Sequence, residues 1–142
     1  MAIPMDKSVQ DIYLDLIERS SFNSFDGPLV RRDLEATRSQ WRACLMVGDS
    51  AITLRDLADN RNNVDSLLIL TSKESAPTIY EMVKRWSPDV ITVYSKNGTF
   101  SADRYADEDA SYKLVRTGDQ QAHQLLGSSL ETEAIVFSIW WD

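Results

Sequence analysis

The chain has 142 residues, of which 43% are hydrophobic, and this size and composition are typical of one domain with one core. Its 22 acidic residues outnumber its 15 basic ones, and the net charge of −7 disfavours binding to nucleic acid and to anionic membranes. A single histidine, His123, and a single cysteine, Cys44, exclude an internal disulfide and a zinc site made of several His and Cys ligands. We expect one domain over residues 1–142, with no cofactor and no metal.

The apolar stretches are too short for a secretory signal or a membrane span. The longest, Ala134–Trp141, is interrupted by Ser138 and falls far below the roughly 20 residues that a membrane helix needs. We therefore expect a cytoplasmic protein. Cys44 follows Ala43 and precedes Leu45, so we expect it to be a small buried apolar side chain.

Two helices are predicted in the first third of the chain. Ser8 and Asp11 have the spacing of a capping box, and apolar residues then recur at helical intervals at Val9, Ile12, Tyr13, Leu16 and Ile17. A second helix is predicted from Gly27-Pro28, because proline suits a first helical turn. Residues 41–47 fit either a continuation of helix or a strand that ends at Gly48, and we favour the strand.

A strand, a helix and a strand are predicted over the middle of the chain. The apolar run Leu67–Leu70 leads into a helix over residues 75–86, for which Ser75 is placed as the cap and Pro77 lies in the first turn. Val90–Tyr94 then reads as the second strand.

A hairpin over residues 90–105 is predicted from Asn97-Gly98, the dipeptide that favours a tight two-residue turn. Its register pairs Val93 with Ala102 and Ile91 with Arg104. Further elements are expected at 112–116 (strand), 119–127 (short helix) and 135–141 (strand). The fold class is therefore α+β: a mixed, mostly antiparallel sheet of about 4–5 strands, packed with the N-terminal helices and the 75–86 helix.

One segment resembles a catalytic motif. Leu45-Met-Val-Gly-Asp-Ser50 is similar to the nucleophile block of the SGNH, or GDSL, serine hydrolases. The resemblance implies that Ser50 attacks an ester carbonyl and that a late acid and base, here Asp119 and His123, activate it. The chain departs from that family in the spacing of Asp119 and His123 and in lacking a Gly-x-Asn-Asp block. The alternative is a polar turn that follows a strand or helix.

A second candidate site is the loop over residues 71–75. Ser72, Lys73 and Ser75 precede a predicted helix, whose free N–H groups bind a phosphate or carboxylate in many proteins. The segment lacks the glycines of a nucleotide-binding loop, and ordinary helix capping accounts for the same residues.

The aromatic residues favour an interaction surface. Trp140 and Trp141 are neighbours, so in a strand they point to opposite faces of the sheet and only one of them enters the same core. The other, with Tyr94, Tyr105 and Tyr112, is a candidate for an exposed aromatic patch. The alternative is that helices cover both faces.

We therefore expect a non-enzymatic module that binds another protein, or a second copy of itself, through a sheet face and an acidic surface. A small serine hydrolase acting through Ser50 and an anion-binding protein acting through the 71–75 loop are the two alternatives.

Overall fold

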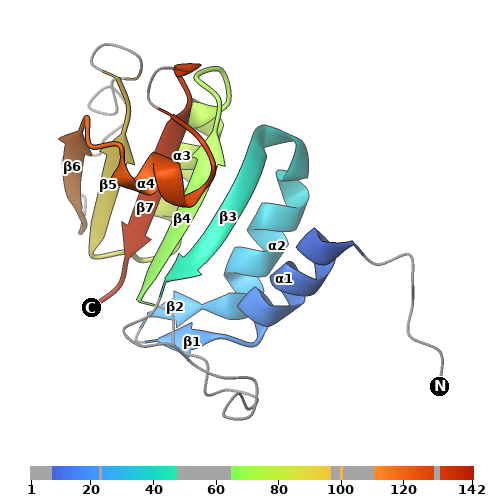
Figure 1. Cartoon of the computed structure of the whole chain (residues 1–142). Coiled ribbons are helices and arrows are strands. Elements are labelled where there is room, and N and C mark those ends of the chain that lie inside the picture. Colours follow the sequence, from blue (N-terminus) through green and yellow to red (C-terminus); the bar gives the residue numbers. More distant parts are fainter. Residues whose placement is uncertain (1–7, 23, 48–64, 97–99, 101–110, 130–131) are drawn as a thin grey trace.

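A computed structural model describes residues 8–22, 24–47, 65–96, 100, 111–129 and 132–142 (Figure 1). The helices over these residues are α1 (Val9–Glu18), α2 (Gly27–Ala36), the short 3-10 helix η1 (Arg38–Gln40), α3 (Ala76–Lys84) and α4 (Gln121–Leu125). The strands are β1 (Ser21–Phe22), β2 (Phe25–Asp26), β3 (Trp41–Val47), β4 (Ser66–Thr71), β5 (Val90–Tyr94), β6 (Lys113–Thr117) and β7 (Ile135–Trp140). The expected α+β class is confirmed, and residues 41–47 form a strand.

Strands β3 to β7 form one sheet in the order β3-β4-β7-β5-β6, and β1 and β2 form a separate two-stranded ribbon. All neighbours in the larger sheet are antiparallel except β5 and β6, which are parallel. The sheet is therefore mixed and mostly antiparallel, as the sequence predicted. In Figure 1, α3 lies behind this sheet, α4 lies in front of it, and α1 and α2 pack together beside β3.

The first two helices begin where their capping residues predict. Ser8 Oγ accepts a hydrogen bond from the Asp11 N–H at 3.1 Å, and Asp11 Oδ2 accepts one from the Ser8 N–H at the same distance. The expected apolar stripe of α1 is partly wrong, since Val9 and Ile12 are 83% and 57% exposed. Apolar residues occur on all sides of α1, so the residues that are buried are those that face the elements packed against this helix.

The predicted pairing of the 90–105 hairpin is not made by β5, because β7 and β6 occupy both edges of that strand. Val93 is opposite Phe137 of β7 and Arg116 of β6. Residues 97–99 and 101–104 lie outside the described residues. The large apolar side chains of β7 explain why β5 pairs with β7. This pairing buries more apolar surface than a pairing with residues such as Ala102 and Arg104 would bury.

The sheet has a different cover on each face. The main core lies between one face and α1, α2 and α3, where the largest fully buried side chains include Trp86, Trp141, Tyr80 and Phe137. A smaller cluster lies on the other face under α4 and contains Leu68, Leu70, Ala122, Ala134 and Val136. Since α4 is only five residues long, it covers this second face incompletely.

Candidate functional site

The candidate site is the incompletely covered sheet face, which we call the α4 face. It is made of alternate residues of adjacent strands, because side chains alternate between the two faces of a sheet. Across its middle, Leu45, Leu68 and Ser138 lie in one row on β3, β4 and β7. In the next row toward the end of β7, Val47 is opposite Ser66, and Ser66 is opposite Trp140.

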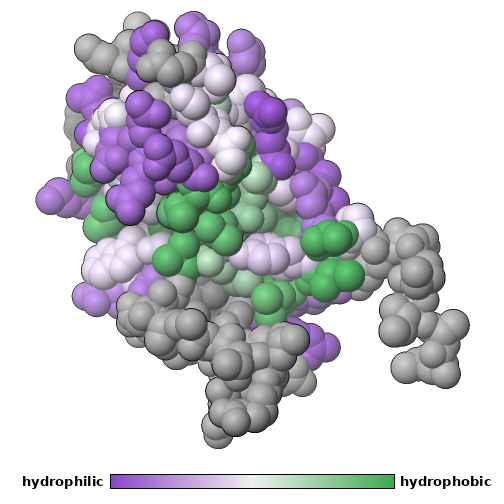
Figure 2. Space-filling view, viewed as in Figure 1, coloured by the Kyte–Doolittle hydropathy of each residue, from purple (hydrophilic) through white to green (hydrophobic). Residues whose placement is uncertain are grey.

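Two of the exposed large apolar side chains in the described part of the chain belong to this face. Trp140 is 37% exposed on β7, and Leu125 is 59% exposed on α4. The other two are Val9 and Ile12 on α1. Figure 2 shows hydrophobic side chains gathered near the centre of this side of the molecule and a second group toward α1. The α4 face therefore carries an apolar surface at its centre.

A groove of about 210 Å³ lies between α4 and the sheet on this face. It is lined by Val47, Ser66, Leu68, Tyr94, Asp119, Gln121, Ala122, Leu125 and Ser138. Strands β3, β4, β5 and β7 supply its floor, and α4 with the loop before it supplies one wall. The lining combines apolar side chains with a carboxylate, an amide and three hydroxyl groups.

Asp119 is the charged member of the groove lining. Its Oδ1 accepts a hydrogen bond from the Gln121 N–H at 2.9 Å, and its own N–H donates to Thr117 Oγ1 at 3.2 Å. These bonds hold the residue at the start of α4. The pKa of Tyr94 is raised, mainly because burial disfavours the phenolate and also because the negative charge of Asp119 lies nearby.

His123 links α4 to strand β5 of the sheet through a hydrogen bond. It is fully buried, and its Nε2 lies 2.8 Å from the carbonyl oxygen of Tyr94. Because a carbonyl only accepts, the proton of the neutral ring is on Nε2. Nδ1 is buried and has no hydrogen-bond partner in the ranges that the structure describes. His123 is thus a buried packing residue of α4.

The three residues implied by the hydrolase resemblance are not brought together among the described residues. Asp119 bonds to the backbone of Gln121 and does not bond to His123, whose Nδ1 has no partner among the described residues. Within that part of the chain, no carboxylate makes the hydrogen bond that orients a catalytic histidine. Gly48 and Ser50 lie outside the described residues.

The predicted aromatic patch is divided between the two faces. Tyr94 and Trp140 lie on the α4 face. Trp141 is fully buried in the main core, where its Nε1 donates to the carbonyl oxygen of Trp86 at 2.8 Å. The Tyr112 hydroxyl lies 2.8 Å from the Tyr80 hydroxyl and its ring packs at the main core. Tyr105 lies outside the described residues.

The 71–75 loop uses its polar groups within the loop. Ser72 Oγ accepts from the Ser75 N–H at 3.1 Å, and the Ser72 carbonyl accepts from the Ala76 N–H at 2.9 Å. Ser75 is at the cap position of α3, but its side chain makes no cap hydrogen bond, so the expected capping role of Ser75 is wrong. Lys73 is exposed, and Pro77 has no N–H to offer. Few helix N–H groups therefore remain for an anion.

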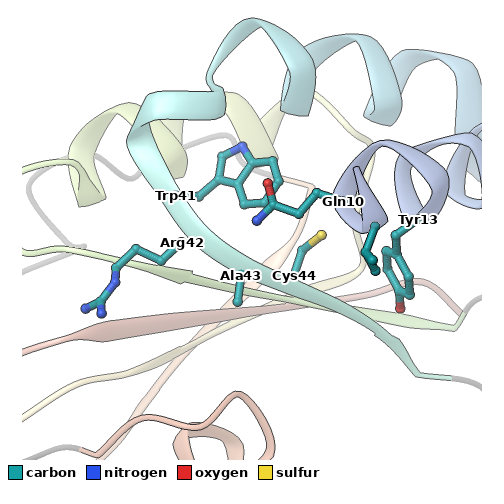
Figure 3. Close-up of a pocket in the computed structure, with 7 residues that line it drawn as sticks. Gln10, Tyr13, Trp41, Arg42, Ala43 and Cys44 are labelled. Carbon is teal, nitrogen blue, oxygen red and sulfur yellow. The ribbon is translucent and has the colours of Figure 1, made fainter. Parts of the chain in front are cut away.

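A second groove, which the sequence did not reveal, lies between α1 and β3 (Figure 3). Cys44 projects from β3 toward α1, where Tyr13 and Gln10 face it, while Ala43 projects to the opposite side of the strand. The Tyr13 hydroxyl accepts from the Met46 N–H at 2.6 Å on the outer edge of β3. Burial raises the pKa of the Cys44 thiol to about 12, so this groove does not hold a reactive thiolate.

In the ranges that the structure describes, no three His, Cys, Asp or Glu side chains are grouped so that they could hold a metal ion. None of the helices in those ranges is long and apolar enough to cross a membrane. Comparisons of the chain with protein-family models, with curated proteins and with solved structures each found no match.

Proposed function

We propose that this protein is a non-enzymatic binding module that docks another protein on the α4 face. The observation that carries the proposal is the exposure of Trp140 and Leu125 beside a groove on a sheet face that α4 covers only in part. Large exposed apolar side chains next to polar groups are typical of protein interaction surfaces, and tryptophan is prominent among the residues that dominate binding energy.

Charge favours a basic partner over a second copy of the chain. At −7, two copies repel one another at long range, whereas a basic protein is attracted and its encounter rate is increased. Asp119 supplies a negative charge at the edge of the apolar surface. We propose that the protein is cytoplasmic, since its one cysteine forms no disulfide within the chain and is half-buried.

The positions of the candidate catalytic residues also favour binding over hydrolysis. His123 is buried beneath α4 and uses its Nε2 on a backbone carbonyl. No carboxylate of the described residues bonds to His123, and its burial restricts the access to substrate that hydrolysis requires.

Affinity capture with a matched pair of surface variants tests the proposal. Leu125 and Ile12 are 59% and 57% exposed on different helices, so Leu125→Ser and Ile12→Ser make the same chemical change on and off the α4 face. We expect both variants to unfold within about 0.5 kcal/mol of the wild type. The immobilised proteins are incubated with cytosol of the source cells, and retained proteins are identified and then purified for direct binding measurements.

The expected result is a basic protein that binds the wild type and Ile12→Ser and binds Leu125→Ser and Trp140→Ala at least about tenfold more weakly. Light scattering of the purified protein is run in parallel. A dimer that Trp140→Ala dissociates would replace the proposed partner with a second copy. A retained set that no α4-face variant changes would contradict the proposal.

A further inference from the structure

We infer that the groove between α4 and the sheet receives an arginine side chain of the partner. This inference rests on the proposed function, because it identifies what the partner inserts on the α4 face. It is carried by the lining of the groove, which places a carboxylate and further hydrogen-bond acceptors at the rim of an apolar channel.

The apolar part of the lining suits the three methylene groups of arginine. Val47 and Leu68 of the sheet and Leu125 of α4 line the groove together with Ala122. Leu68 and Ala122 are each 5% exposed and therefore form a closed floor, whereas Leu125 is accessible at the rim. Arginine buries its hydrocarbon stem along such a surface while its charged end remains with polar groups.

The polar part of the lining suits a guanidinium group. Asp119 uses Oδ1 to accept the Gln121 N–H, and none of the basic side chains in the described ranges forms an ion pair with it. Tyr94 and Gln121 line the same groove, and a tyrosine hydroxyl and a glutamine amide oxygen are both hydrogen-bond acceptors. A planar group with five N–H donors can engage several such acceptors at once, which a lysine ammonium group does less well.

The chemistry of the groove also rejects other side chains. An aspartate or glutamate would meet the negative charge of Asp119, and a purely apolar side chain would make no hydrogen bond to the carboxylate or the amide, which belong to the exposed residues Asp119 and Gln121. Arginine is the side chain that satisfies both parts of the lining.

Blocked tripeptides provide a probe that does not depend on knowing the partner. Acetyl-Leu-Arg-Leu-amide is titrated into the full chain and followed by amide chemical shifts, beside matched peptides with lysine or citrulline in the centre. Citrulline has nearly the shape of arginine without its charge. We expect saturable shifts at groove residues with the arginine peptide, with affinity about three- to tenfold higher than for the citrulline or lysine peptide.

The variant Asp119→Asn tests the carboxylate. Asparagine keeps an oxygen that accepts the Gln121 N–H, so the turn before α4 should be retained, which thermal unfolding verifies. We expect Asp119→Asn to bind the arginine and citrulline peptides equally. Asp142→Asn makes the same change at an exposed carboxylate outside the groove lining and should retain the preference for arginine.

Equal binding of the arginine and citrulline peptides by the wild type, shifts confined to residues outside the groove, or no shift with any peptide would each overturn the inference. Trp140 does not line the groove, so Trp140→Ala should alter peptide affinity less than about twofold while it abolishes partner capture. A negative peptide titration would therefore contradict the arginine inference and leave the affinity-capture result valid. A positive titration with no captured partner would contradict only the proposed protein-binding function.

Discussion

Two neighbouring tryptophans have opposite environments in this molecule. Trp141 is fully buried, its indole contacts Phe25 edge to face with ring centroids 4.8 Å apart, and its Nε1 donates to the Trp86 carbonyl. Trp140 points to the α4 face and is 37% exposed. The alternation of side chains in a strand predicts that the two indoles separate, and the structure shows which one enters the main core.

Truncating these two residues should therefore have unequal effects on stability. We expect Trp141→Ala to lower the free energy of unfolding by about 3–5 kcal/mol, because it leaves a cavity and an unpaired carbonyl. Trp140→Ala should cost less than half as much. Urea denaturation of both variants measures the difference, and equal losses would contradict the assigned environments.

The carboxyl group of Asp11 makes stability depend on pH in the acidic range. Its pKa is lowered from 3.8 to about 2, first because Arg38 Nη2 donates a hydrogen bond at 2.6 Å and then because Ser8 donates through its N–H and hydroxyl groups. A lowered pKa in the folded state means that the stabilising contribution is complete above about pH 4 and is lost as pH falls toward 2.

We expect Asp11→Asn to flatten the decline in stability between about pH 4 and pH 2, because its side chain has no proton to gain. Denaturation midpoints at a series of pH values measure this change. Glu74→Gln, at an exposed position in the β4–α3 loop, serves as the control and should retain the wild-type slope. Parallel curves for the wild type and Asp11→Asn would show that the Arg38 contact does not contribute.

Helices α1 and α2 approach each other closely at Gly27, the first residue of α2. A Cβ atom at this position would lie within 2.7 Å of the carbonyl oxygens of Ile17, Glu18 and Ser20. All three contacts are backbone atoms, so no side-chain rotation relieves them. The packing of the N-terminal helices therefore depends on the absence of a side chain at Gly27.

Gly27→Ala should destabilise the protein by about 1–3 kcal/mol through overpacking, although alanine is normally the better helix residue. Gly118→Ala is the matched control, since a Cβ there would have no atom within 4 Å. That change should be neutral, or stabilising by less than about 1 kcal/mol. Thermal unfolding compares the two variants, and an equal response would contradict the role of close helix contact.

Most helices and strands could be predicted from the sequence because their signals are local. The capping box predicted the start of α1, and Pro77 in a first turn predicted the start of α3. The hairpin prediction was wrong about the neighbours of β5. The turn dipeptide is a local signal, and it gives no information about a strand distant in sequence that pairs with β5 instead. Such competition is decided by the apolar surface that each alternative pairing buries.

At the scale of the whole molecule, strand order was harder to predict, although the sequence held one signal for it. The segments Leu67–Leu70 and Ile135–Phe137 are continuous apolar runs, and both prove to be buried on both faces as β4 and β7. Continuous runs are typical of strands that are covered on both faces, whereas β5, which also has a neighbour on each edge, alternates in burial. Alternation predicted that one of the two tryptophans is exposed without saying which, and the groove could not be predicted because it depends on where α4 packs.

The central position of β7 also constrains the order in which the chain can assemble. Of the five strands in the sheet, β7 is the last to be synthesised, yet it separates the β3–β4 pair from the β5–β6 pair. Until it emerges from the ribosome, β4 and β5 each have an open edge with apolar side chains beside it. Nascent chains at that stage depend on chaperones or on fast completion to avoid pairing with one another.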